Sequence, residues 1–148
     1  MISLIDTNVI INFITKRDDP YKDACLEVMR LCSENIFEGC VAFHSLSIIW
    51  YVIRKQESEV KARAWLNAIC NMLTVVGASQ EQIKGAINNL DFHDFEDCLQ
   101  DECAVHANAE YIVTCNIKDF QHAKTTAVTP DVFVEIVAAG KNMNDSKI

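Results

Sequence analysis

Short apolar segments alternate with amphipathic segments along the chain, and this alternation constrains the fold more than any other feature of the sequence. Residues 2–5, 39–43, 73–77 and 127–128 fit short strands, and helical periodicity fills most of the intervals between them. Strands that alternate with helices are typical of a parallel sheet. We therefore predict an α/β domain of three layers, with a mostly parallel central sheet flanked by helices.

The helical periodicity differs in clarity from segment to segment. Periodicity alone does not decide between strand and buried helix for residues 45–53. Ser45 or Ser47 as an N-cap, with Arg54 and Lys55 at the end, favours a helix there. A short helix is expected to begin near Val9. The other predicted helices are residues 21–34, 59–73, 79–90, 95–108 and 130–140.

The length and composition of the chain predict one folded domain. The chain has 148 residues, of which half are hydrophobic, and domains most often contain about 100–150 residues. This hydrophobic fraction is enough for a core. We expect a single domain over residues 1–140 and a frayed tail over residues 141–148, because the tail has little to bury.

The charge balance bounds the kinds of partner. The formal net charge is -8, which argues against a protein that coats nucleic acid by charge alone, because phosphate binding needs clustered Lys and Arg. It does not exclude a nucleic-acid enzyme whose metal ions supply positive charge. It also suits a basic protein partner.

The cysteines and the apolar runs indicate neither a secreted protein nor a membrane protein. There are seven cysteines, an odd number without a Cys-x-x-Cys pair, so a zinc site or a thiol redox function is a distant third reading. Buried thiols in a reducing compartment are favoured. Met1 is followed at once by a strand pattern, and no apolar run approaches the roughly 20 residues of a membrane span. We expect a soluble, cytoplasmic protein.

Carboxylates follow two of the predicted strands. Asp6 ends the first strand, and Asp119 closes a polar loop after the strand near Val113. Parallel strands place ligands at their carboxyl ends, so neighbouring strands would bring these acids to one edge of the sheet. The full set of acids to weigh is Asp6, Asp94, Glu96, Asp97, Asp101, Glu102 and Asp119.

Each of these acids also has an ordinary structural interpretation. Asp6 and Asp94 can cap helices, and Asp97 suits the positive end of a helix dipole. Asp119 can close an Asx-turn. Asp101 and Glu102 are expected on the solvated face of their helix. Catalysis is therefore argued from the convergence of the acids and not from any one of them.

Converging carboxylates would suit a hard divalent cation. Magnesium and manganese prefer carboxylate oxygens, and such a site can activate water against a phosphodiester. Thr7, Thr114 and Asn116 can support it with neutral hydrogen bonds. Lysines and an arginine near these segments can contact phosphate, although solvated surface charge is the more ordinary reading for each. They are Arg54, Lys55, Lys118 and Lys124.

Three segments together resemble a known family. LIDTNVI at the start, DFEDCLQ in the middle and IVTCNIKDF near the end resemble the PIN domain, and most of all the ribonuclease toxins of VapC-like toxin–antitoxin pairs. The resemblance implies RNA cleavage that depends on Mg²⁺ or Mn²⁺, a homodimer, and inhibition by a small antitoxin protein. It implies metal binding by Asp6, Asp97 and Asp119, with Asn116 completing the catalytic set.

One position departs from the family pattern. The family carries a glutamate in a segment like S-x-x-x-E-[IL]-x-Y, and the aligned residue here is Ile48. Isoleucine cannot bind a metal ion, and Asp94 is the acid we expect nearby to compensate. His44 could face the site, but a structural role is favoured for it. The alternative reading is a degenerate PIN domain that binds RNA or a protein partner without cleavage.

Overall fold

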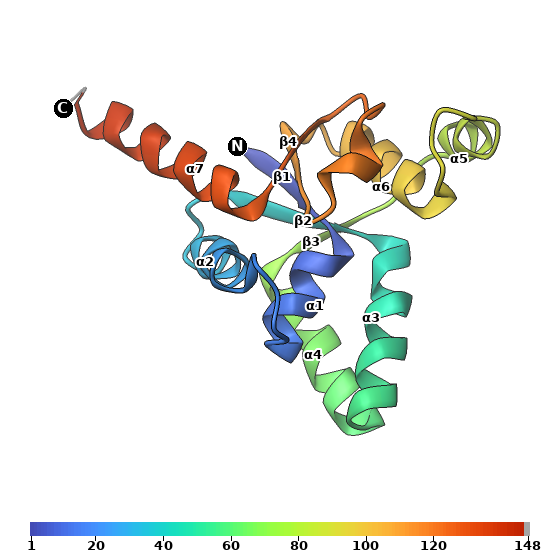
Figure 1. The fold of residues 1–148 in the computed structure, drawn as a ribbon, viewed down its shortest axis with the longest axis horizontal. Helices are drawn as coiled ribbons and strands as arrows, with labels where there is room; N and C mark the ends of the chain where they lie inside the picture. Colours follow the sequence, from blue (N-terminus) through green and yellow to red (C-terminus); the bar gives the residue numbers. More distant parts are fainter. Residues whose placement is uncertain (147–148) are drawn as a thin grey trace.

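The computed structural model describes residues 1–146 and contains a central sheet with helices on both faces (Figure 1). Five strands and seven α-helices are formed by the described residues, with one short 3₁₀ helix, η1. The elements in chain order are β1 Ile2–Ile5, α1 Thr7–Thr15, α2 Lys22–Ser33, β2 Glu38–Ala42, α3 Phe43–Gln56, α4 Glu59–Met72, β3 Thr74–Val76, α5 Gln80–Ile87, α6 Phe95–His106, β4 Tyr111–Val113, η1 Ile117–Phe120, β5 Thr126–Val128 and α7 Pro130–Asp145.

All strand pairs are parallel, and the strand order is β3-β2-β1-β4-β5. The α/β class and the flanked sheet are therefore confirmed, and the sheet is entirely parallel where the sequence predicted mostly parallel. β2 and β3 lie on one side of β1, and β4 and β5, which come later in the chain, lie on the other side. The order reverses between β1 and β4, and ligands of open α/β sheets bind at the carboxyl ends of the strands at such a switch point.

Alternating side chains of the strands divide the core into two layers. Ile5, Val41 and Val113 pack against α1, α2, α3, α4 and α7. Leu4 and Ile112 face the opposite way and pack against α6 and η1. This follows from the strand geometry, in which successive side chains point to opposite faces. Because both faces are covered, the strands can be almost continuously apolar.

Several boundaries differ from the sequence prediction. β2 ends at Ala42 and α3 starts at Phe43, so His44 lies in the first turn of a helix and not at the end of a strand. Segment 45–53 is helical, as favoured, but Ala42 and not a serine occupies the N-cap position. α7 continues to Asp145, beyond the predicted end at Gly140. The last two residues of the predicted tail lie outside the described residues.

No helix among residues 1–146 is both long enough and apolar enough to cross a membrane.

Candidate functional site

The residues that directly follow β1 and β4 lie side by side at the carboxyl edge of the sheet. β1 and β4 are hydrogen-bonded neighbours, as convergence of the acids requires, and the backbone N–H of Asp6 donates to the carbonyl of Val113 at 3.0 Å. Asp6 comes immediately after β1, and Thr114 comes immediately after β4. The parallel register therefore places both side chains at one edge of the sheet.

Asp6 is held from two sides and buried, with 3% of its surface exposed. It occupies the N-cap position of α1, but its side chain makes no capping hydrogen bond in the described chain. Instead, Thr114 Oγ1 donates to Oδ2 at 2.8 Å, and Gln100 Nε2 donates to Oδ1 at 2.7 Å. Burial raises the pKa of Asp6 to about 6, helped by the nearby carboxylates of Glu96 and Asp119. The ordinary capping role of Asp6 is therefore ruled out by its contacts.

Gln100 connects two carboxylates from inside the protein. Besides Asp6, its Nε2 lies 3.2 Å from Oε1 of Glu96 and 3.1 Å from Oγ1 of Thr7. The residue is fully buried, and within residues 1–146 its Oε1 has no hydrogen-bond partner. The opposite amide orientation would set the carbonyl oxygen against carboxylate oxygens, so the electrostatics favour this one.

Glu96 makes a second contact that ties it to α3. Nε2 of His44 lies 3.0 Å from Oε1 of Glu96, and both residues are partly exposed. His44 is thus hydrogen-bonded to a carboxylate next to the candidate site, which agrees with the structural role that the sequence favoured. Glu96 is the acid that reaches Asp6 through Gln100. The helical spacing of four residues between Glu96 and Gln100 would have indicated this shared face.

Asp97 and Asp119 lie at a small hollow of roughly 70 Å³ between α6 and η1. The hollow is lined by Asp91, His93, Asp94, Asp97, Lys118, Asp119, Gln121 and His122. Asp97 is half-buried in the first turn of α6, whereas Asp119 is exposed on η1. Burial, together with the charges of Glu96, Asp6, Asp94 and Asp119, raises the pKa of Asp97 to about 8. Carboxylates from three elements are therefore close enough to disfavour each other's ionisation.

Neutral side chains fix the loop and the start of α1 around these acids. Thr7 Oγ1 donates to Ser45 Oγ at 2.8 Å, while it accepts from Gln100. Thr114 Oγ1 accepts the backbone N–H of Asn116 at 3.0 Å. The side chain of Asn116 is exposed on the loop, so it is free to reach a ligand in solution. Thr7 and Thr114 therefore support the site from the protein interior, and Asn116 lies at its solvent-exposed edge.

Asp94 has the capping role that was one of its two predicted interpretations, and Ile48 adds no metal ligand, as expected of an isoleucine. Asp94 caps α6, with Oδ1 accepting the backbone N–H of Glu96 at 2.7 Å. Ile48 is partly buried and packs against the core layer that contains Ile5, Val41 and Val113, so it adds no polar group to the candidate site. Of the acids, Glu96 and not Asp94 is therefore joined to Asp6.

The expectation of a solvated face for Asp101 and Glu102 is wrong. Both side chains are buried, because Asp101 accepts the backbone N–H groups of Lys124 and Thr125 at 2.8 and 3.0 Å. Nζ of Lys124 lies 2.6 Å from Oε1 of Glu102. These acids fasten the segment after η1 to α6, and Lys124 is engaged in an ion pair.

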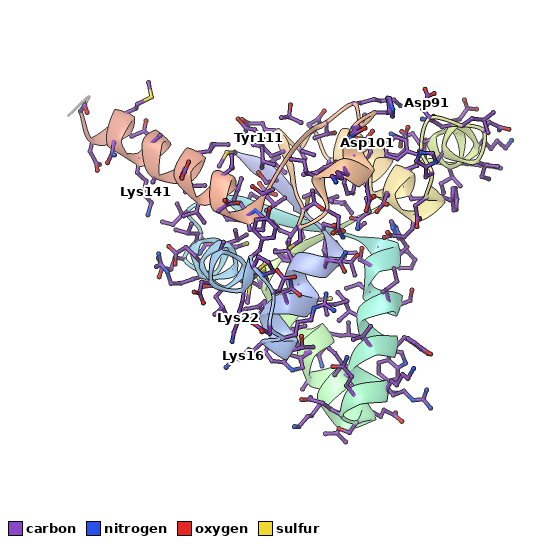
Figure 2. All side chains as sticks on the ribbon, viewed as in Figure 1. Lys16, Lys22, Asp91, Asp101, Tyr111 and Lys141 are labelled. Atoms are coloured by element: carbon purple, nitrogen blue, oxygen red, sulfur yellow. The ribbon has the colours of Figure 1, made fainter. Side chains whose placement is uncertain are left out.

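The other three basic residues that the sequence suggested as phosphate contacts lie at different distances from the acids. Lys118 lines the small hollow, whereas Arg54 and Lys55 lie in the last turn of α3, on the order of 15 Å from its first turn at about 1.5 Å per residue. Figure 2 shows Lys16 and Lys22 at the turn between α1 and α2, on the opposite side of the sheet from Asp91. Lys118 is thus the cation placed to act at the hollow.

A larger hollow of about 670 Å³ lies at the opposite end of the strands. Met1, Glu38 and Thr74 line it, and these residues lie at or next to the starts of β1, β2 and β3. Ligands of parallel α/β folds bind at the carboxyl ends. The acids, their raised pKa values and the switch in strand order all favour the smaller hollow as the site.

The carboxylate set fits a hard divalent cation in its chemistry. Within residues 1–146, no three His, Cys, Asp or Glu side chains are already grouped so that they could hold a metal ion. Burial nevertheless raises the pKa values of Asp6 and Asp97, and repulsion from neighbouring carboxylates adds to the effect. A divalent cation relieves this repulsion, and oxygen donors suit Mg²⁺ and Mn²⁺.

A family comparison agrees with this architecture. The family model described as PIN domain matches residues 3–118, which is more than half of the chain. The chain belongs to the PIN domain family. The matched range includes Asp6, Gln100 and Thr114 and ends one residue before Asp119. Among curated proteins, no sequence matches the chain significantly.

Solved structures of toxin–antitoxin proteins share the PIN fold seen here. The chain is similar to VapBC2 of Rickettsia felis bound to a promoter DNA fragment, with 20% identity, a TM-score of 0.68, and coverage of 87% of this chain and 98% of that one. It is similar to VapBC-1 of nontypeable Haemophilus influenzae at 15% identity and a TM-score of 0.67, covering 88% and 99% of the two chains.

The same fold occurs in a toxin that cleaves the sarcin–ricin loop, VapC20 of Mycobacterium tuberculosis. The identity is 15%, the TM-score is 0.65, and 86% of this chain and 99% of that one are covered. At this level of identity, the comparison establishes a common fold.

Proposed function

We propose that this chain is a metal-dependent endoribonuclease that acts as the toxin of a toxin–antitoxin pair. Asp6, Asp97 and Asp119 would hold Mg²⁺ or Mn²⁺. The observation that carries the proposal is the crowding of carboxylates at the β1–β4 switch point, where the pKa of Asp6 is raised to about 6 and that of Asp97 to about 8. Acids with strongly perturbed pKa values cluster at functional sites.

The buried contacts prepare Asp6 for its role. Gln100 and Thr114 each donate to one carboxylate oxygen, so the carboxylate plane is fixed before any ligand arrives. Gln100 also donates to Glu96, which His44 holds from α3. A site fixed by buried donors needs little reorganisation when charge develops on a substrate.

A bound divalent cation would supply charge stabilisation for the phosphoryl oxygens of RNA and would lower the pKa of water. With its pKa raised to about 8, Asp97 would hold a proton near neutral pH and would have to release it to bind the cation. Asn116 at the rim is placed to orient a ligand or a water molecule. Lys118 would contact a backbone phosphate, which offsets part of the acidic charge of the protein.

The comparisons also support a protein partner. The similar structures from Rickettsia felis and Haemophilus influenzae are VapBC assemblies. The net charge of -8 suits a basic partner. We propose a small antitoxin as the inhibitor of this chain and a homodimer as its working form.

One observation favours a second function, which is RNA or protein binding without cleavage. Ile48 packs into the core, so α3 gives the site His44 but no carboxylate at the position where the family has its glutamate. Fewer acids hold a divalent cation less tightly. Binding without cleavage is therefore the alternative that the experiment below must separate.

The test is cleavage of structured RNAs by the purified protein with Mn²⁺. We expect cleavage by the wild type and by Asp23→Asn, a change at an exposed acid in the first turn of α2. Asp97→Asn and Asp119→Asn are expected to lose it. Equal cleavage by all four proteins would point to a contaminant and contradict the proposal. RNA binding without cleavage by the wild type would favour the second function.

A further inference from the structure

The thiols of two cysteines that are far apart in the sequence lie next to each other in the fold. Cys25 lies on α2 and Cys115 in the loop after β4, and their Sγ atoms are 3.7 Å apart. Nδ2 of Asn12 lies 3.9 Å from the sulfur of Cys25 and 3.5 Å from that of Cys115. Asn12 is itself buried, and Arg17 Nε donates to its Oδ1. The two thiols thus share one donor from α1.

The surroundings distinguish this pair from the other cysteines. Cys25 is fully buried, whereas Cys115 is partly exposed, so a small oxidant can reach the pair from the side of Cys115. The thiols of Cys32 and Cys40 donate instead to backbone carbonyls, and Cys70 is exposed on α4. The hydrogen bond from Cys115 lowers the pKa of Cys25, which favours a thiolate within the pair.

We propose that Cys25 and Cys115 form a redox-sensitive thiol pair that a peroxide converts into a disulfide, which ties the loop after β4 to α2. The sulfurs need to approach from 3.7 Å to a bond length of about 2 Å. This modification site is independent of the acids, although its loop leads directly to them.

The chemistry balances with hydrogen peroxide as the oxidant. A thiolate of the pair attacks one peroxide oxygen, the O–O bond breaks, and the departing hydroxide takes up a proton to leave as water. The sulfenic acid formed is attacked by the second sulfur, an S–S bond forms, and the hydroxyl group leaves with the thiol proton as a second water. Two electrons pass from the sulfurs to the peroxide.

The disulfide would restrict a segment that holds the site together. Cys115 lies between Thr114, which donates to Asp6, and Asn116, whose N–H donates to Thr114. The next element, η1, carries Asp119. A covalent tether on Cys115 therefore limits local opening of residues 114–119. Any effect on RNA cleavage rests on the proposed function, whereas the disulfide and the restricted loop do not.

The test uses the full-length protein treated with hydrogen peroxide and then with dithiothreitol. Peptide mapping of the wild type is expected to find Cys25 joined to Cys115 after peroxide and both thiols free after dithiothreitol. Cys25→Ser and Cys115→Ser are each expected to lose the cross-link, so a folding defect in one leaves the other informative. Cys70→Ser is the control, because it removes an exposed thiol on α4 and should keep the cross-link.

Amide hydrogen exchange of residues 114–119 gives the second readout. Exchange is expected to slow in oxidised wild type and in oxidised Cys70→Ser, and to stay unchanged in Cys25→Ser. A different cross-link, or oxidation of Cys115 to a sulfinic acid without a cross-link, would overturn the proposal. So would a Cys25–Cys115 disulfide that leaves the exchange unchanged. None of these readouts depends on nuclease activity, so their failure is distinct from failure of the proposed function.

Discussion

The amide nitrogen of Gln100 lies 2.7 Å from Oδ1 of Asp6, and this contact joins the middle of α6 to the end of β1. The amide is fully buried, and it also reaches Glu96. One neutral side chain thus sets the spacing of two carboxylates without adding charge. Gln100 is a positioning residue, since it acts on the site through the acids that it holds.

Replacing Gln100 by methionine tests this role. Gln100→Met keeps the volume but removes the donor, which leaves a buried Asp6 oxygen without its partner. We expect the free energy of unfolding to fall by about 1–3 kcal/mol at pH 8. The loss should be smaller at pH 5, where Asp6 is protonated and needs the donor less. Urea unfolding at both pH values measures it, with exposed Gln56→Met as the control. An equal loss at both pH values would show that packing alone is affected.

The raised pKa of Asp97 predicts how stability depends on pH. The pKa is about 8 in the fold against an ordinary value of 3.8, so the fold binds this proton more tightly than the unfolded chain does. The stability from Asp97 is therefore complete below pH 3.8 and is lost as the pH rises through 8. We expect Asp97→Asn to have a higher Tm than the wild type at pH 8.5. Thermal scans from pH 5.5 to 8.5 should show a flatter dependence for the variant, and a lower Tm at pH 8.5 would contradict the charge crowding.

Metal binding should compete with the same protons. Mn²⁺ needs ionised carboxylates, and Asp97 holds a proton below about pH 8. The apparent Mn²⁺ affinity is therefore expected to rise by up to about tenfold per pH unit between pH 6 and 8. Calorimetric titration at pH 6, 7 and 8 measures it, with Asp97→Asn expected to bind weakly at all three. Affinity that does not change with pH would show that Asp97 is not a ligand.

The fold was readable from the sequence because its signals are local and repeated. Short apolar runs between amphipathic helices predicted the α/β class, and the helix predicted over residues 79–90 begins correctly, at the N-cap Ser79 of α5. The boundary between β2 and α3 was missed because Phe43 is apolar and continues the strand pattern into the helix. The end of α7 was missed because its last turns are polar and exposed, and periodicity gives no signal there.

The acids of the site were visible in the sequence, but the contacts that hold them were not. Gln100 carries no charge and belongs to no strand end, so it was not singled out. The meeting of His44 with Glu96 depends on how α3 and α6 pack across the sheet, which no local pattern encodes. The same is true of Cys25 and Cys115, which are 90 residues apart. Long-range pairing sets these distances, whereas spacing along the chain shows only what one helix face can share.

Returning a carboxylate to α3 tests what Ile48 does to metal binding. Residue 48 lies one turn after His44 on α3. Helix side chains lean toward the N-terminus of the helix, so a glutamate there would extend toward His44 and the candidate site. We expect Ile48→Glu to bind Mn²⁺ roughly tenfold more tightly than the wild type, because an added carboxylate holds the cation. Its free energy of unfolding should fall by about 1–3 kcal/mol, because a polar group enters the core edge. Ile48→Gln is the matched control, with the same loss of stability and no gain in affinity. Calorimetric titration and urea unfolding separate the two effects, and equal affinities for the glutamate and glutamine variants would show that the site does not extend to α3.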